Sequence, residues 1–458
     1  MSASPEFDAS YALEDRYQTE AGRVFLTGNQ ALVRLPLMQR RRDRAAGLNT
    51  AGFISGYRGS PLGIFDMNLW QAKTLLEAHD IHFESGLNED LAATAVWGSQ
   101  QSGLLADPKH DGVFGMWYGK GPGVDRACDA LKHANYAGTA PHGGVLALMG
   151  DDPGAKSSSI AHQSETAMIH CGIPILNPSS VQDYLDFGLY GWALSRYSGA
   201  WVGFKCLTDT IESSGSFSVS PDRIQIVSPT DYEMPPGGLH IAWGNLPLQV
   251  EARLYEERLV AVRAFVRAND IDRVELEGTR RRMGIVTTGK AYGDLRQALE
   301  ELGLDDAKAR DLGISIYKVG LTWPLEPEGL RRFAAGQENL LILEEKRPIM
   351  EEQIASLLFN LTDRPRRFGK EDLAGRPLVP QFGELTPSVV VVVLRRWIAD
   401  CCADTPDASR LQSLLRPEPE SAAPAGLLGG PVRPPSFCSG WPPHRSPGGP
   451  ACRCRLRG

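Results

Sequence analysis

The sequence lacks the closely spaced cysteine sets that hold iron–sulfur clusters. None of its eight cysteines forms a Cys-x-x-Cys pair, and clusters are bound by grouped thiolates. Cys128, Cys171 and Cys206 stand far apart in the main body, as small buried hydrophobic residues commonly do. The other cysteines all follow Asp400. An iron–sulfur cluster is therefore not expected in this chain.

A standard phosphate-binding loop is missing too. Gly119-Lys120-Gly121 lacks the spacing of such a loop and has no Ser or Thr after its lysine. The sequence therefore does not predict an ATP site.

Long apolar runs and basic clusters that would define a partner are scarce as well. The longest purely apolar run, Val389–Leu394, is far shorter than the roughly 20 residues of a membrane helix; it reads as a buried strand or the start of a core helix. Met1–Glu20 has no secretory pattern, and a net charge of -7 gives no basic footprint for nucleic acid. We expect a cytoplasmic protein that binds neither membranes nor nucleic acid.

What the sequence does contain is a regular alternation of strands and helices. Short apolar runs alternate with amphipathic stretches through residues 22–228, and a second series of the same kind occupies residues 283–399. Strands separated by helices of this length predict an α/β fold with parallel sheets covered on both faces. Helices are expected over 64–78, 248–269 and 292–302, among others.

The pattern divides the chain into five parts. We expect an N-terminal arm (1–21), a first α/β domain (22–228), a connecting segment (229–282), a second α/β domain (283–399) and a tail (400–458). The tail has no lysine, has no acid after Glu420 and is rich in Pro, Gly, Ser, Arg and Cys. Such a composition predicts disorder, either as a basic interaction tail or as residues translated out of frame.

Polar and glycine-rich loops follow the predicted strands of the first domain, where ligands of parallel sheets bind. Asn88 is a plausible N-cap for a helix whose first turn holds Glu89 and Asp90. The other such loops are Tyr57–Pro61, Tyr118–Asp125 and Gly150–Ser159.

Four runs in these regions resemble fused-type indolepyruvate ferredoxin oxidoreductases: FISGYRGSPLG (53–63), GLNEDLAATAVWGSQQ (86–101), GVFGMWYGKGPGVDR (112–126) and SVQDYLDFGLYGWALSRYSG (180–199). The resemblance extends from about Arg23 to Ala399. It implies that the first domain has the pyrimidine-binding fold of thiamine-diphosphate enzymes. It also implies that the second domain resembles the C-terminal domain of transketolase.

The resemblance assigns the catalytic carboxyl group to Glu89. In thiamine enzymes the cofactor carries the chemistry, and a protein carboxyl must hydrogen-bond its pyrimidine ring. That group shares a proton with the ring, which favours partial burial. The alternative is that Glu89 only stabilises a helix N-terminus.

Further site residues follow from the same resemblance. Ser60 matches a hydroxyl that binds the substrate oxygen, and Arg58 is suited to the substrate carboxylate. Lys120 and Asp125 lie in a matching loop and are assigned to cofactor binding. The alternatives are a Ser-Pro turn and surface charges.

No metal ligand is assigned. Asp151 and Asn177 have nearly the spacing of the thiamine diphosphate–Mg²⁺ motif, but that motif begins Gly-Asp-Gly, which is absent here. We interpret the spacing as coincidence or a relic of a common fold. The diphosphate half of the thiamine diphosphate–Mg²⁺ site is expected outside this chain.

The function implied is oxidative decarboxylation of aryl-pyruvates to acyl-CoA, with coenzyme A and ferredoxin as partners and an iron–sulfur cluster in the complete enzyme. The chain is expected to be a truncated, inactive part of it, acting as a homo-oligomer or beside a partner subunit. Two alternatives stay open: another thiamine-dependent 2-oxoacid oxidoreductase, or a non-catalytic fragment that binds a partner.

Overall fold

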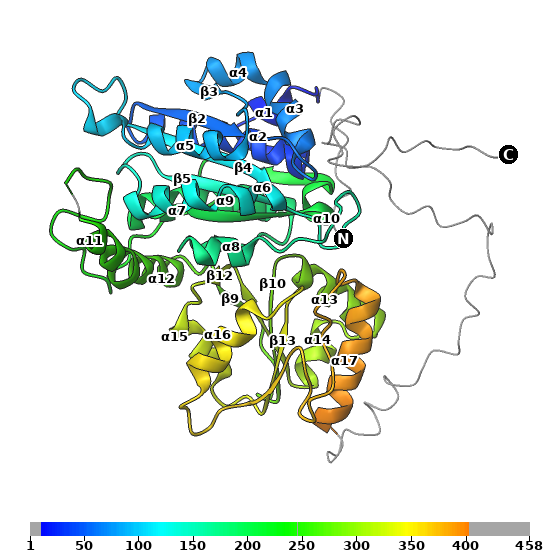
Figure 1. Ribbon diagram of the computed structural model, residues 1–458. Helices are drawn as coiled ribbons and strands as arrows, with labels where there is room; N and C mark the ends of the chain where they lie inside the picture. Colours follow the sequence, from blue (N-terminus) through cyan, green and yellow to red (C-terminus); the bar gives the residue numbers. More distant parts are fainter. Residues whose placement is uncertain (1–10, 245, 403–458) are drawn as a thin grey trace, which may run out of the picture.

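The structure is a computed structural model that describes residues 11–244 and 246–402 (Figure 1). Most of the predicted tail therefore lies outside the described residues, and so does the beginning of the N-terminal arm. Within the described part no helix is both long and apolar enough to cross a membrane.

The first unit is built on a seven-stranded sheet with the order β12-β6-β7-β5-β4-β2-β3. Six strands are parallel, and β12 pairs antiparallel with β6. The strands are β2 (Thr50–Gly56), β3 (Ile81–Phe83), β4 (Gly112–Lys120), β5 (Val145–Asp151), β6 (Ile175–Leu176), β7 (Val202–Leu207) and β12 (Leu321–Trp323). The predicted parallel α/β sheet is confirmed.

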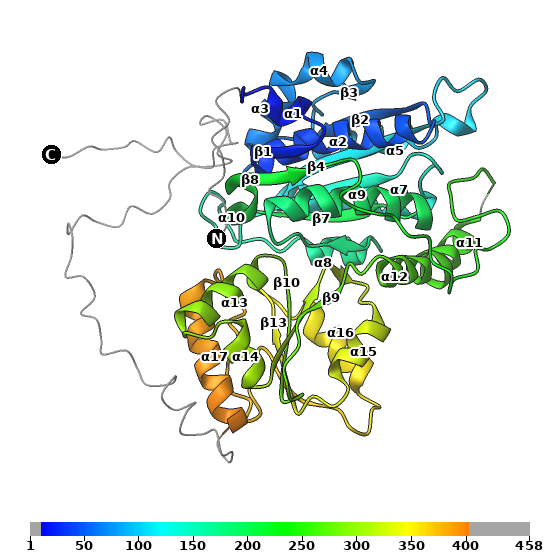
Figure 2. The same ribbon diagram turned by 180° about the vertical axis from the view of Figure 1, so that it is seen from behind.

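Helices cover both faces of this sheet (Figures 1 and 2). On β5, Leu146 and Leu148 join one hydrophobic core, while Val145 and Ala147 join the other, because successive strand residues point to opposite faces. The first core is completed by α2 (Gly28–Ala45) and α9 (Val181–Ser198), and the second by α5 (Glu89–Ser99) and α7 (Cys128–Ala137).

Shorter elements complete the first unit. Directly after the arm, β1 pairs antiparallel with β8 in a separate two-stranded sheet. The predicted helix over 64–78 is two helices, α3 and α4, which meet at Ala72. The elements are α1 (Asp15–Gln18), β1 (Gly22–Thr27), α3 (Gly63–Gln71), α4 (Lys73–Glu77), a 3₁₀ turn (Ser102–Leu104), α6 (Gly121–Arg126), α8 (Glu165–His170), α10 (Thr208–Ile211) and β8 (Ser214–Val219).

The second unit has a five-stranded sheet with the order β14-β13-β10-β11-β9. One hydrophobic core joins it to α13, α14 and α17, and another joins it to α15 and α16. The apolar run 389–394 therefore lies in a helix. The elements are β9 (Arg273–Leu276), β10 (Met283–Thr288), β11 (Ile314–Val319), β13 (Asn339–Leu343), β14 (Arg366–Phe368), α13 (Gly289–Glu301), α14 (Asp306–Asp311), α15 (Pro327–Ala334), α16 (Ile349–Leu358) and α17 (Pro387–Cys402).

Strand β12 and several side-chain contacts connect the two units. β12 follows β11 in the chain but completes the sheet of the first unit. Asp272 Oδ1 accepts hydrogen bonds from the backbone N–H of Gly320 and Leu321, at 2.7 and 2.9 Å. The Asn177 side chain lies against Gly289, which has a positive φ of 51° and whose Cβ, if present, would be 2.4 Å from Asn177 Oδ1. The absence of a side chain at Gly289 therefore permits the close approach of Asn177.

The connecting segment is held by one buried arginine. The expected helix over 248–269 comprises α11 (Pro247–Ala252), a π-helical turn (Arg253–Arg258) and α12 (Leu259–Ala268). The fully buried Arg258 ends the turn and donates to the carbonyls of Leu239, Asn135, Tyr136 and Ala137 at 2.9–3.2 Å. Its guanidinium thereby satisfies carbonyls at the end of α7, and burial lowers its pKa to about 10.

Replacing Arg258 by methionine should lower the free energy of unfolding by on the order of 3 kcal/mol, because four buried or partly buried carbonyls lose their donor. Arg253→Met is the control, since Arg253 pairs only with Glu257 at 3.6 Å and should cost about 1 kcal/mol or less. Urea unfolding would measure both. Equal effects would contradict the role given to Arg258.

Candidate functional site

The buried carboxyl group of Glu89 lies at the start of α5. As predicted, Asn88 is the N-cap, and its Oδ1 accepts a hydrogen bond from Leu91 N at 2.8 Å. Trp117 Nε1 donates to the Glu89 carbonyl at 3.1 Å. These contacts fix the backbone at Glu89. The residue is buried, with only 8% of its surface exposed.

The Glu89 side chain packs on the glycine-rich segment after β4. A Cβ on Gly123, in α6, would be 2.5 Å from Glu89 Oε1, and one on Gly119 would be 3.6 Å from Glu89 Cγ. The missing side chains make room for the carboxyl group. Glu89 and residues 119–123, where β4 ends and α6 begins, thus form one surface at the carboxyl ends of β2 and β4.

Ser60 joins the loop after β2 to the loop after β5. Its Oγ is 2.7 Å from Ser157 Oγ, and Ser157 N donates to Asp152 Oδ2 at 2.8 Å. Asp152 Oδ1 is buried without a hydrogen-bond partner. Ser60 itself is buried, as is Asp152. The three side chains form a polar cluster that ends in an unpaired carboxylate oxygen.

The two predicted cations occupy different environments. A Cβ on Gly59 would be 2.5 Å from Lys120 Cδ, so the buried lysine lies over the backbone next to Ser60. Arg58 is exposed. Lys120 thus belongs to the packed site, and Arg58 is accessible from solvent.

Asp125 lies farther out than the other predicted residues. Its carboxylate is 59% exposed and lies 3.4 Å from the imidazole Nε2 of His162. A Cβ on Gly121 would also contact that ring, at 2.3 Å from Cγ. Asp125 therefore contacts the far end of the loop after β5.

Asp151 is engaged in a buried charge cluster. Its carboxylate accepts from Ser164 N at 2.9 Å and from Ser164 Oγ at 2.6 Å, and burial raises its pKa. Lys205 pairs with Glu165 beside it. Burial alone would lower the pKa of Lys205, but Glu165 and Asp151 raise it.

Asn177 and its surroundings provide no obvious cation site. Its Oδ1 packs at Gly289 and has no partner. No group of three or more His, Cys, Asp or Glu side chains could hold a metal ion among residues 11–244 and 246–402.

The loop after β5 also binds the second unit, a feature that the sequence did not predict. Lys156 Nζ lies 3.2 Å from Glu384 and 2.8 Å from Asp209, and Gln163 Oε1 accepts from Arg347 N at 3.1 Å. Ser157, between them, was missed as a site residue because its contact with Ser60 spans 97 positions. Its only sequence signal was a place in the polar loop 150–159.

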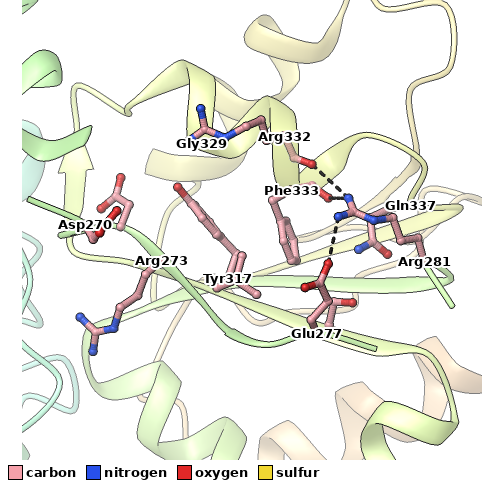
Figure 3. A pocket seen from close by; sticks show the side chains of 12 residues that line it. Asp270, Arg273, Glu277, Arg281, Tyr317, Gly329, Arg332, Phe333 and Gln337 are labelled. Carbon is pink, nitrogen blue, oxygen red and sulfur yellow. Dashed lines mark hydrogen bonds and ion pairs between the residues drawn. The ribbon is translucent and has the colours of Figure 1, made fainter. Parts of the chain in front are cut away.

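A separate cavity of about 230 Å³ lies in the second unit, between β9, β11 and α15 (Figure 3). Tyr317 stacks on Phe333 at its floor. Arg281 donates to the carbonyls of Arg332, Phe333 and Ala335 and pairs with Glu277. No predicted site residue lines this cavity, and Arg281 serves the local structure.

The fold is that of 2-oxoacid oxidoreductases. A solved 2-oxoglutarate:ferredoxin oxidoreductase from Magnetococcus marinus, with 2-oxoglutarate, coenzyme A and succinyl-CoA bound, superposes with a TM-score of 0.56 at 18% identity. The match covers 82% of this chain and 65% of that one.

Sequence comparison finds similarity to a narrower group of proteins. Residues 273–416 match the family model of the indolepyruvate oxidoreductase domain. The indolepyruvate oxidoreductase subunit IorA of Pyrococcus abyssi is 24% identical over 436 residues, covering 88% of this chain and 57% of that protein. The IorA of Methanothermobacter thermautotrophicus is 26% identical over 351 residues, 75% of this chain and 50% of that protein. The resemblance to indolepyruvate oxidoreductases is confirmed, and the chain spans about half the length of these relatives.

The contact between Glu89 and Gly123 makes a measurable prediction. An alanine within a helix ordinarily stabilises it by about 0.5–1 kcal/mol relative to glycine. Here Gly123→Ala should instead destabilise the protein, by about 1–3 kcal/mol, because the new Cβ displaces the Glu89 side chain. In a Glu89→Ala background the same change should become neutral or stabilising. Chemical denaturation of the four proteins of this cycle would measure the effect, and equal effects in both backgrounds would contradict the contact.

Proposed function

We propose that this chain forms the pyrimidine-binding half of a thiamine-diphosphate-dependent 2-oxoacid oxidoreductase. The observation that carries the proposal is the position of the buried residue Glu89. Its side chain packs against Gly119 and Gly123 at the carboxyl edge of the parallel sheet. Ligands of such sheets bind at this edge. The similarity to indolepyruvate oxidoreductases along most of the chain supports the same assignment.

Glu89 acts as the proton-sharing residue. Bound thiamine diphosphate would supply the carbon nucleophile that attacks the 2-oxoacid. Glu89 would hydrogen-bond the pyrimidine nitrogen of the bound cofactor through its carboxyl group. Asn88 and Trp117 hold the backbone from which this carboxyl projects.

Ser60, Arg58, Lys120 and Asp125 serve the ligands around this centre. The Ser60 hydroxyl, oriented by Ser157, binds the substrate's keto oxygen. The exposed Arg58 reaches the substrate carboxylate as a guanidinium fork. Lys120, at the end of β4, and Asp125, in α6, contribute to cofactor binding.

The complete reaction requires parts beyond these residues. We assign the substrate to the aryl-pyruvates, with coenzyme A as acyl acceptor and ferredoxin as electron acceptor. The diphosphate and its Mg²⁺, together with an iron–sulfur cluster, are then held outside this chain, by a partner polypeptide or by further domains of a longer one. The exposed apolar side chains Tyr57, Ile64, Leu87 and Leu91, which flank the carboxyl ends of β2 and β3, support a partner at this edge.

Glu89→Gln should lower the turnover of indolepyruvate by about 100-fold or more in the enzyme assembled with its partner, because the amide cannot share the proton. Asp90→Asn is the matched control. Asp90 is the next residue of the same helix and forms a surface pair with Arg126 at 3.0 Å, so its loss should leave turnover within about twofold. Undiminished turnover in Glu89→Gln, measured as ferredoxin reduction, would contradict the catalytic role assigned to Glu89.

Isothermal titration of the isolated chain with thiamine diphosphate and Mg²⁺ should give no measurable binding, because the diphosphate half is assigned to a partner. Adding the partner should produce binding that Glu89→Gln weakens. Strong binding by the chain alone would contradict the assignment of the diphosphate half to another part. It would make Asp151 and Asn177 candidate Mg²⁺ ligands again.

A further inference from the structure

A basic cavity of about 540 Å³ lies beside the second half of α2. Four arginines of that helix line it: Arg34, Arg41, Arg42 and Arg44. The arm element α1 and strand β1 pack on the same helix (Figure 2). The cavity has the size of known small-molecule sites, which are about 300–1,000 Å³.

Two of these arginines have unused donors. Arg34, only 1% exposed, donates to the carbonyls of Arg16 and Thr19, but its Nε has no partner. Arg41 donates from one Nη to the Tyr17 carbonyl at 3.0 Å, while its other Nη is buried without a partner. Burial and, to a smaller extent, the neighbouring Arg41 lower the pKa of Arg34 to about 10. Leaving charged N–H groups unpaired in a buried place is costly.

The nearby acids compensate these charges only in part: Arg44 pairs with Asp80 at 3.0 Å, and Asp222 also lines the cavity. Glu20 is 68% exposed, and its carboxylate lies 3.7 Å from Arg41 Nε, too far for a hydrogen bond. Arg42 is turned to the carbonyls of Pro221 and Ile224. Four arginines against the two lining acids, Glu20 and Asp222, leave the lining with a net positive charge.

Apolar side chains form another part of the lining, beside polar residues such as His79, Ser220 and Gln225. Met38 is on the same helix as the arginines, Leu189 comes from α9, and Ile224 follows β8. These side chains suit an apolar body attached to the anionic group. A ligand with both parts would match the cavity better than an inorganic ion.

The cavity is separate from the candidate catalytic site. Arg41, Arg42 and Arg44 lie in the last turns of α2, and the chain then enters β2 at Thr50. They therefore lie toward the amino end of β2, whereas Arg58 and Ser60 follow its carboxyl end. A strand of this length spans about 20 Å.

We propose that this cavity binds a small phosphomonoester with an apolar body, its phosphate on Arg41 and Arg34. A phosphate offers three acceptor oxygens and close to two negative charges, which guanidinium groups bind in a fork. A carboxylate offers fewer of both. The proposal does not depend on the function proposed for the other edge of the sheet.

Titration of the full chain with phenyl phosphate tests the proposal, with inorganic phosphate and benzoate as comparison probes. Phenyl phosphate should bind at least tenfold more tightly than either, because only it has both parts. Arg41→Gln should weaken its binding tenfold or more. Arg331→Gln, a surface arginine change on α15, and Arg58→Gln at the catalytic edge should leave it unchanged.

A blocking variant keeps the test decisive if Arg41→Gln does not fold. Ala45→Trp, at an exposed position lining the cavity, should obstruct entry with every arginine in place and abolish binding. No binding at millimolar concentration in the unaltered chain would overturn the proposal. So would binding that depends on Arg58 rather than Arg41, or that persists in both cavity variants.

Discussion

The buried cluster of Asp151, Lys205 and Glu165 is the interaction on which the centre of the molecule depends. The three charges lie where β5 and β7 end and α8 begins, and their residues are at most 5% exposed. An isolated buried charge is strongly unfavourable, so each of them requires the others. The pairing of Lys205 with Glu165, and the hydrogen bonds from Ser164 to Asp151, hold the loop after β5 at both of its ends.

That loop connects the chemistry of the first unit to the second unit. At its middle Ser157 meets Ser60, and on either side Lys156 and Gln163 contact residues of the second unit. The Ser60 hydroxyl is therefore positioned partly by the way the two units pack. The same junction holds a small cavity lined by Lys205 and Glu345, among others, and burial raises the pKa of Glu345.

The sequence was sufficient where local chemistry decides the structure. Asn88 was predicted as an N-cap because a side-chain oxygen at that position satisfies the first free N–H groups of a helix. The parallel strands followed from apolar runs of strand length. In contrast, the break between α3 and α4 and the π-helical turn before α12 were missed. No glycine or proline marks either place, and packing against the rest of the fold decides the backbone there.

Contacts between distant residues could not be predicted in the same way. The position of Ser157 depends on a partner 97 residues away, and Arg258 serves carbonyls more than 120 residues before it. The unpaired Nε of Arg34 likewise becomes visible only once α1 is packed on α2. The roles of Glu89, Ser60, Arg58, Lys120 and Asp125 stay predictions, since they depend on ligands as well as on the fold.

The placement of β12 has a consequence for any attempt to separate the two units. The natural point of division in the sequence lies just before β10, yet Leu321 and Trp323, well beyond it, pair with the short outer strand β6. A chain cut there would expose the backbone N–H and C=O groups along β6. Bare strand edges of this kind recruit other strands, so the first unit on its own would be prone to aggregate for reasons unrelated to its core.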